Sequence, residues 1–86
     1  MNITLQLFGR FRYFGAAPEL ALEFPGIATV ADFRAAFDAW ARAHWPGYPP
    51  GLLQASAIAT ESSLLRADSA LPADGRLALL PPVSGG

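Results

Sequence analysis

Residues 29–44, TVADFRAAFDAWARAH, decide the fold class, because they predict one long amphipathic helix in a chain otherwise rich in strand patterns. Thr29 followed three residues later by Asp32 is typical of a helix N-cap. Helical spacing is then followed by Val30, Phe33, Phe37, Trp40 or Ala41, and His44. The pattern predicts about four turns with one face toward a core. We interpret the aromatic stripe as core rather than as a cofactor site.

Two strands are predicted before this helix. Apolar and polar residues alternate from Asn2 to Phe8, and Phe8 falls on the polar face, where we expect an exposed aromatic ring. Residues 19–24 alternate in the same way. Between them, residues 9–15 (GRFRYFG) predict a loop or a short helical turn. The two strands can therefore pair as an antiparallel hairpin with a long connection.

Three further segments follow the helix and a turn-rich loop. Residues 54–60 predict a third strand, residues 62–66 a short fourth strand or turn, and residues 76–80 the last strand. In the last strand, Leu77 and Leu79 face one side, whereas Ala78 and Leu80 face the other.

This order of elements predicts an α+β roll of the β-grasp, or ubiquitin-like, type. We expect a mixed sheet of four to five strands, with one main helix packed across it and with the first and last strands as parallel neighbours. The β-grasp domain would span residues 1–80, and a flexible Gly-Gly tail would span residues 81–86.

Composition limits the class of protein. The 86 residues are 52% hydrophobic and 15% charged with a net charge of −1, which is typical of one small folded domain. The sequence contains no cysteine, and its single His44 cannot build a metal site without several carboxylate partners, so we expect no metal site. The charge disfavours nucleic-acid binding, and no apolar run approaches the roughly 20 residues of a membrane span. Without a signal-peptide pattern, we expect a cytoplasmic protein.

The ending Pro81-Pro82-Val83-Ser84-Gly85-Gly86 is the most informative functional feature. Proline favours an extended path, and glycine allows the main chain to approach another surface closely. Six extended residues reach roughly 20 Å. Such a tail can carry the carboxylate of Gly86 into a narrow channel of another protein.

Two segments resemble a known family. Residues 77–86 (LALLPPVSGG) and residues 8–12 (FGRFR) are similar to the MoaD/ThiS family of ubiquitin-like sulfur carriers. The Pro-Pro-Val-Ser-Gly-Gly ending looks specifically like the small subunits of molybdopterin synthase. Element order and length agree with the family over the whole chain, which implies the same β-grasp fold.

The resemblance implies that the carboxylate of Gly86 is the reacting group. A ubiquitin-activating-like adenylyltransferase would use ATP to form an acyl-adenylate there, and a persulfide sulfur donor would convert it to a thiocarboxylate. The tail would then enter the large subunit of molybdopterin synthase and donate sulfur to the molybdopterin dithiolene. The residues assigned to tail insertion are Pro81, Pro82, Val83, Ser84 and Gly85. The chain would bind no cofactor and would not be catalytic alone.

The resemblance also implies a partner interface at Phe8, Leu64 and Leu80. Phe8 and Leu80 already fall off the core-facing alternation, so the pattern and the resemblance agree. The chain departs from the family at Thr60-Glu61, where Val-Asn is common, and at Gly75-Arg76, where Gly-Asp is common. These departures concern the partner surface rather than the chemistry of the tail.

Three alternatives remain beside the molybdopterin reading. The chain can be a sulfur carrier for thiazole, cysteine or tRNA thiolation, with the same chemistry at Gly86. It can be a protein modifier joined through Gly86 to a lysine amine. It can also be an interaction module with an inert tail.

Overall fold

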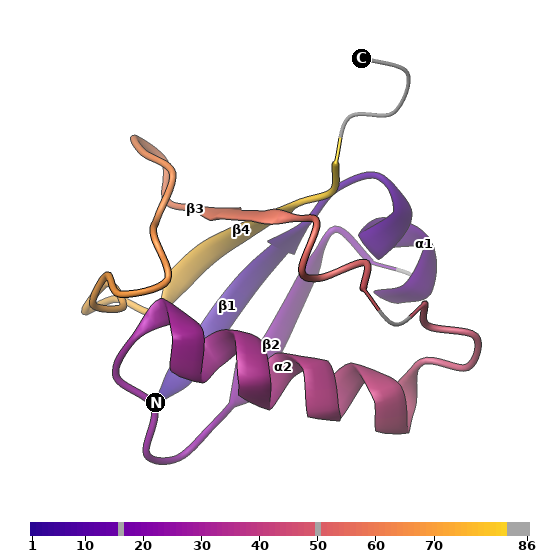
Figure 1. Ribbon diagram of the computed structural model, residues 1–86, viewed down its shortest axis with the longest axis horizontal. Helices are drawn as coiled ribbons and strands as arrows, with labels where there is room; N and C mark the ends of the chain where they lie inside the picture. Colours follow the sequence, from indigo (N-terminus) through magenta and orange to yellow (C-terminus); the bar gives the residue numbers. More distant parts are fainter. Residues whose placement is uncertain (16, 50, 83–86) are drawn as a thin grey trace.

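A mixed four-stranded sheet with α2 packed across one face forms the centre of the molecule (Figure 1). The computed structural model describes residues 1–15, 17–49 and 51–82. Its elements are β1 (Asn2–Leu7), α1 (Arg10–Gly15), β2 (Glu19–Glu23), α2 (Val30–His44), β3 (Ala57–Ala59) and β4 (Arg76–Leu80). The predicted α+β class, with one main helix and a mixed sheet, is confirmed.

The strand order is β2-β1-β4-β3. β1 pairs antiparallel with β2, and β3 pairs antiparallel with β4. At the centre, β1 and β4 run parallel with Leu7 opposite Leu79, as predicted for the first and last strands. The carboxyl ends of these two strands therefore lie side by side at one end of the sheet.

The start of α2 carries the predicted N-cap as a full capping box. The Oγ1 atom of Thr29 accepts a hydrogen bond from the main-chain N–H of Asp32 at 3.2 Å, and Oδ2 of Asp32 accepts one from the N–H of Thr29 at 3.1 Å. Two otherwise unpaired donors of the first turn are thereby satisfied. At the other end, Nδ1 of His44 lies 2.8 Å from the carbonyl oxygen of Trp40, and the two rings stack.

The core lies between the sheet and α2, and it contains the inward-facing residues of both. Its largest fully buried side chains are Phe11, Phe33, Phe37, Ile3, Leu5, Leu7, Ile58, Leu79 and Val30. Truncating a buried Phe to Ala costs about 3–5 kcal/mol, so this cluster fixes the sheet against α2.

The strand predicted over residues 54–60 is shorter than expected, and the prediction was wrong at its first part. β3 covers only Ala57–Ala59, because the residues before it form turns. Arg34 of α2 holds those turns by donating hydrogen bonds to the carbonyl groups of Leu53 and Ser56, at 2.8 and 2.9 Å. The contact comes from a distant helix, so local alternation does not reveal it.

Residues 62–66 form a turn rather than a strand. The N–H of Thr60 donates to the carbonyl oxygen of Ser63 at 2.9 Å. A single bridge between Leu64 and Ala59 then returns the chain to the side of β3. Residues 10–15 form the short helix α1, which was the second option predicted for this segment.

Candidate functional site

The candidate site begins where β4 leaves the sheet. Because Leu79 pairs with Leu7 in the parallel β1–β4 ladder, the next residues, Leu80 and Phe8, lie side by side at the same end of the sheet. Beyond them the chain continues into Pro81, which is half-buried, and Pro82, which is exposed. The end of β4 therefore points out of the domain, close to the turn that leads into α1 (Figure 1).

Gly9 lies directly against Pro81. Its φ of +55° is in the left-handed region, and a Cβ atom built on it would lie 2.7 Å from Cγ of Pro81. Only glycine both adopts this backbone conformation without strain and leaves room for the proline ring. The Gly9 turn therefore sets where the first tail residue lies relative to the sheet.

Phe8 and Leu80 place an apolar surface on the outer face of the sheet, opposite α2. Phe8 is 41% exposed, as expected from its position on the polar face of the strand, and Leu80 is half-buried. Ala78 lies on the same face, because alternate residues of a strand share one side. We call the set Phe8, Ala78, Leu80 and Leu64 the outer apolar surface.

Leu64 reaches this surface from the far side of β3. It is 68% exposed and bridges to Ala59, which pairs with Ala78. Two strand spacings, about 10 Å, separate the row of Leu64 from β4. The structure thus places Phe8 and Leu80 close together, whereas Ala59 and Ala78 lie between Leu64 and β1.

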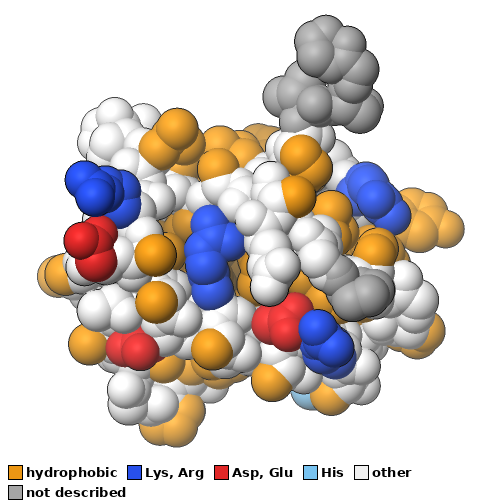
Figure 2. Space-filling model, in the orientation of Figure 1, with side chains coloured by type: hydrophobic (Ala, Val, Ile, Leu, Met, Phe, Trp, Pro, Cys, Tyr) orange, Lys and Arg blue, Asp and Glu red, His pale blue; other side chains and the backbone are white. Residues whose placement is uncertain are grey.

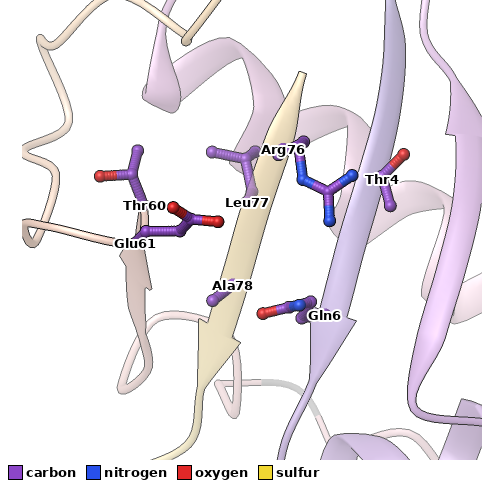
Figure 3. Close-up of a pocket in the computed structure, with 7 residues that line it drawn as sticks. All are labelled: Thr4, Gln6, Thr60, Glu61, Arg76, Leu77 and Ala78. Atoms are coloured by element: carbon purple, nitrogen blue, oxygen red, sulfur yellow. The ribbon is translucent and has the colours of Figure 1, made fainter. Parts of the chain in front are cut away.

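A small hollow includes Ala78, one member of the outer apolar surface, in its lining (Figure 3). It has a volume of about 50 Å³ and is lined by Thr4, Gln6, Thr60, Glu61, Arg76, Leu77 and Ala78. The side chain of Arg76 extends from β4 over β1, and Glu61 approaches β4 from the opposite side. Both departures from the family pattern therefore meet here, although they are 15 residues apart in the chain, at Glu61 and Arg76.

Gly75, just before Arg76, is fixed by the main chain. It has a φ of +70°, and a Cβ atom there would collide with the main-chain oxygen of Asn2. Its carbonyl oxygen accepts a hydrogen bond from the N–H of Thr4 at 2.9 Å. The glycine of this turn is structural, whereas the residue after it faces solvent.

Sequence reasoning missed Tyr13, the most exposed large apolar side chain among the described residues at 85%. In α1 only Phe11 is buried. Helical spacing from Phe11 turns Phe14 toward the aromatic ring of Trp45, with a centroid distance of 5.6 Å, and leaves Tyr13 outside. Treating residues 10–15 as a helix rather than a loop would have found it.

Two side chains away from the tail have shifted pKa values. Hydrogen bonds from the main-chain N–H groups of Ala28 and Thr29 lower the pKa of Asp32. Burial, with a further contribution from Asp38, raises the pKa of Tyr48, whose hydroxyl has no partner among the described residues. Positive and negative side chains are interspersed on the face shown in Figure 2.

Several expected site residues lie outside the part of the chain that the structure describes. These are Val83, Ser84, Gly85 and Gly86. Among residues 1–15, 17–49 and 51–82, no three His, Asp or Glu side chains come together as a metal site. Within the same residues, no helix is long and apolar enough to cross a membrane.

Solved structures resemble this one over its whole length, among them two of Haloferax volcanii proteins. The crystal structure of SAMP1 from Haloferax volcanii has a TM-score of 0.69 and 26% sequence identity, and the match covers all of both chains. The solution structure of the Haloferax volcanii HVO 2177 protein has a TM-score of 0.73 at 20% identity, covering all of this chain and 87% of that one. No protein-family model matches the chain, and no curated protein matches its sequence.

These similarities establish the ubiquitin-like β-grasp fold. SAMP1 is a ubiquitin-like small archaeal modifier protein, a kind of protein related to the MoaD/ThiS carriers. The likeness therefore supports a ubiquitin-like carrier or modifier role in general, without singling out molybdopterin synthase.

Proposed function

We propose that this protein is a ubiquitin-like sulfur carrier that is activated at the carboxylate of Gly86. The observation that carries the proposal is the exit of β4. The last strand lies at the centre of the sheet, ends beside β1, and passes over Gly9 into the Pro81-Pro82 segment. A domain built in this way holds its final strand between two neighbouring strands and directs the chain after Leu80 away from the sheet.

The proposed activation has three steps. A carboxylate oxygen of Gly86 attacks the α-phosphorus of ATP on an adenylyltransferase, and pyrophosphate leaves. The terminal sulfur of a persulfide then attacks the acyl carbon, and AMP leaves. A second thiol cleaves the resulting acyl disulfide, which yields the thiocarboxylate of Gly86 and a disulfide between the donor and that thiol. The catalytic groups belong to the partners, and this chain supplies the tethered carboxylate.

We further propose the molybdopterin branch, with this chain as the small subunit of molybdopterin synthase. The resemblance of the Pro-Pro-Val-Ser-Gly-Gly ending supports this choice. Phe8, Leu64 and Leu80 would dock on the large subunit, since exposed apolar side chains on one sheet face gain most from being covered. A tail that starts at the edge of the docked face would enter the large subunit at high effective concentration.

The adjacent hollow adds a charge requirement to that docking. Arg76 and Glu61 line it from opposite sides of β4 and form no ion pair with each other in the described residues. A partner that covers the outer apolar surface would have to present groups of opposite charge to both. In the family, Asn is common at the position of Glu61 and Asp at that of Arg76. A large subunit whose surface fits those residues would therefore bind this chain poorly.

A second candidate function is protein modification. Its support is the likeness to SAMP1, a small archaeal modifier protein. In that role the same acyl-adenylate would lead to an isopeptide bond between Gly86 and a lysine amine of a target. Both roles require an activating enzyme, so they differ only after the adenylate.

Reconstitution separates the two roles. Thiocarboxylated chain is mixed with a large subunit and cyclic pyranopterin monophosphate, and the pterin is analysed by mass spectrometry. Since a dithiolene contains two sulfur atoms, we expect two chains to return to the carboxylate for each molybdopterin formed. Absence of product from competent thiocarboxylate would contradict the molybdopterin branch. Gly86–lysine peptides in digested cell extract would support the modifier role instead.

A further inference from the structure

The outer edge of β2 is an open strand edge. β2 is a terminal strand of the sheet, and β1 covers its other side (Figure 1). Pro18 accepts a hydrogen bond from the N–H of Leu7, and Phe24 donates one to the carbonyl oxygen of Met1. Because bonded residues alternate in an antiparallel ladder, the main-chain groups of Glu19, Ala21 and Glu23 point away from β1.

These outward groups find no partner in the described chain. Among residues 1–15, 17–49 and 51–82, no loop, turn or cap hydrogen bond involves the main chain of Glu19, Ala21 or Glu23. The opposite edge of the sheet is different, since the N–H of Leu65 donates to the carbonyl oxygen of Ile58 at 2.8 Å and closes part of β3. Unpaired strand edges of this kind readily accept another strand.

Side chains give the β2 edge a definite chemistry. Leu20 and Leu22 point toward the core but remain partly exposed. On the outer face, Glu19 and Glu23 are exposed and form no ion pair with another described residue. Arg12 lines the same hollow as Glu19, but among the described residues it forms no ion pair with that carboxylate. The edge therefore presents apolar groups on one face and negative charge on the other.

We propose that the β2 edge binds an extended peptide strand of a partner protein, with alternating apolar and basic residues. In an antiparallel addition, residues opposite Glu23 and Glu19 would be Lys or Arg. Residues opposite Leu22 and Leu20 would be apolar and would cover those side chains. The sequence pattern is basic, apolar, any, apolar, basic. Pro18 and Pro25 bound the edge, so the added strand covers about five residues, and antiparallel pairing supplies its main-chain hydrogen bonds.

A second copy of this chain is a poor occupant. A two-fold axis at Ala21 would place Glu19 of one copy opposite Glu23 of the other, and like charges directly opposite are destabilising. The β2 edge adjoins the outer apolar surface at one hollow, which both Phe8 and Glu19 line, whereas Ala21 and Glu23 do not line it. Strand addition uses the main chain of β2, so it does not depend on activation of Gly86.

The test uses the full chain and the capped peptide Ser-Gly-Lys-Val-Thr-Val-Lys-Gly-Ser, followed by amide chemical shifts. We expect the largest shifts and slowed hydrogen exchange at the N–H groups of Glu19, Ala21 and Glu23. Ala21→Pro removes one outward donor at a position where an edge strand tolerates proline, and it should abolish binding. Ala21→Thr keeps the donor and should bind as the original chain does.

Charge reversal provides a second, independent test. The double variant Glu19→Lys with Glu23→Lys should bind the peptide about tenfold more weakly, and a peptide with Glu in place of both Lys should recover the affinity. Equal binding by Ala21→Pro, shifts confined to the outer apolar surface, or self-association through β2 would each overturn the proposal. A failure of sulfur transfer would leave these measurements unaffected.

Discussion

Gly9 and Pro81 are in contact although 72 positions separate them, and the glycine has a φ of +55°. The contact joins the turn after β1 to the first residue after β4. It follows from the parallel pairing of these strands, because both strands finish at the same end of the sheet. The position of the first tail residue is thus determined by the N-terminal part of the chain.

Replacing Gly9 with Ala tests this contact. The new Cβ atom would lie 2.7 Å from Cγ of Pro81, in addition to the backbone strain of roughly 1–2 kcal/mol for a left-handed residue with a side chain. Gly26→Ala is the matched control, because Gly26 has a φ of +76° and nothing within 4 Å of the added atom. Urea unfolding should show that Gly9→Ala loses about 1–3 kcal/mol more than Gly26→Ala. Equal losses would mean that Pro81 moves away without cost.

The outer apolar surface predicts the effect of added charge. Phe8→Arg or Leu80→Arg should weaken binding to the cognate large subunit or activating enzyme about tenfold or more, since each would bury an unpaired charge. Thermal unfolding should change little for Phe8→Arg, because Phe8 is already exposed. Tyr13→Arg, at an exposed site on α1, should bind normally in the same calorimetric titration. Unchanged affinity for both sheet variants would place the interface elsewhere.

The capping box predicts a pH dependence of stability. Hydrogen bonds from main-chain N–H groups lower the pKa of Asp32 below its usual 3.8. A lowered pKa in the folded state means that the contribution is present above the unfolded-state pKa and is lost as the pH falls through the folded-state value. The melting temperature should therefore fall on acidification below about pH 4, and it should fall less steeply for Asp32→Asn. Parallel melting curves for the two chains would contradict this role.

Arg34 should support the turns before β3. Its guanidinium donates to the carbonyl oxygens of Leu53 and Ser56 from a partly buried position. Arg34→Ala should lower the unfolding free energy by about 1.5–3 kcal/mol, the range for hydrogen bonds to charged groups. Arg34→Lys should recover only part of this loss, because an ammonium group lacks the planar fork that serves two acceptors. Full recovery by Lys would show that charge alone matters.

The sequence predicted α2 closely because its signals are local. Thr29 and Asp32 lie one turn apart, and the apolar stripe begins at Val30, directly after Thr29. Pattern and structure therefore agree on the start of the helix. The alternation in β1 and β4 likewise gave the correct inward faces. The parallel pairing followed from the order of the elements.

The remaining features depend on contacts between distant segments. Arg34 of α2 bonds the turns before β3, and Leu64 reaches the outer face through one bridge to Ala59. Glu61 and Arg76 line one hollow, and Ala21 lies on an open strand edge. Both features become visible only once the strand order is known. Alternation along one segment carries no information about which strand will be its neighbour.

The central claim is that Gly86 carries sulfur. Its most direct test is the intact mass of the chain after incubation with ATP, a competent activating enzyme and a persulfide donor. We predict the gain expected when one oxygen is replaced by sulfur, localised to Gly86 by fragmentation, and no gain in a variant lacking Gly86. An unchanged mass, with enzyme and donor shown to act on another carrier, would contradict the account.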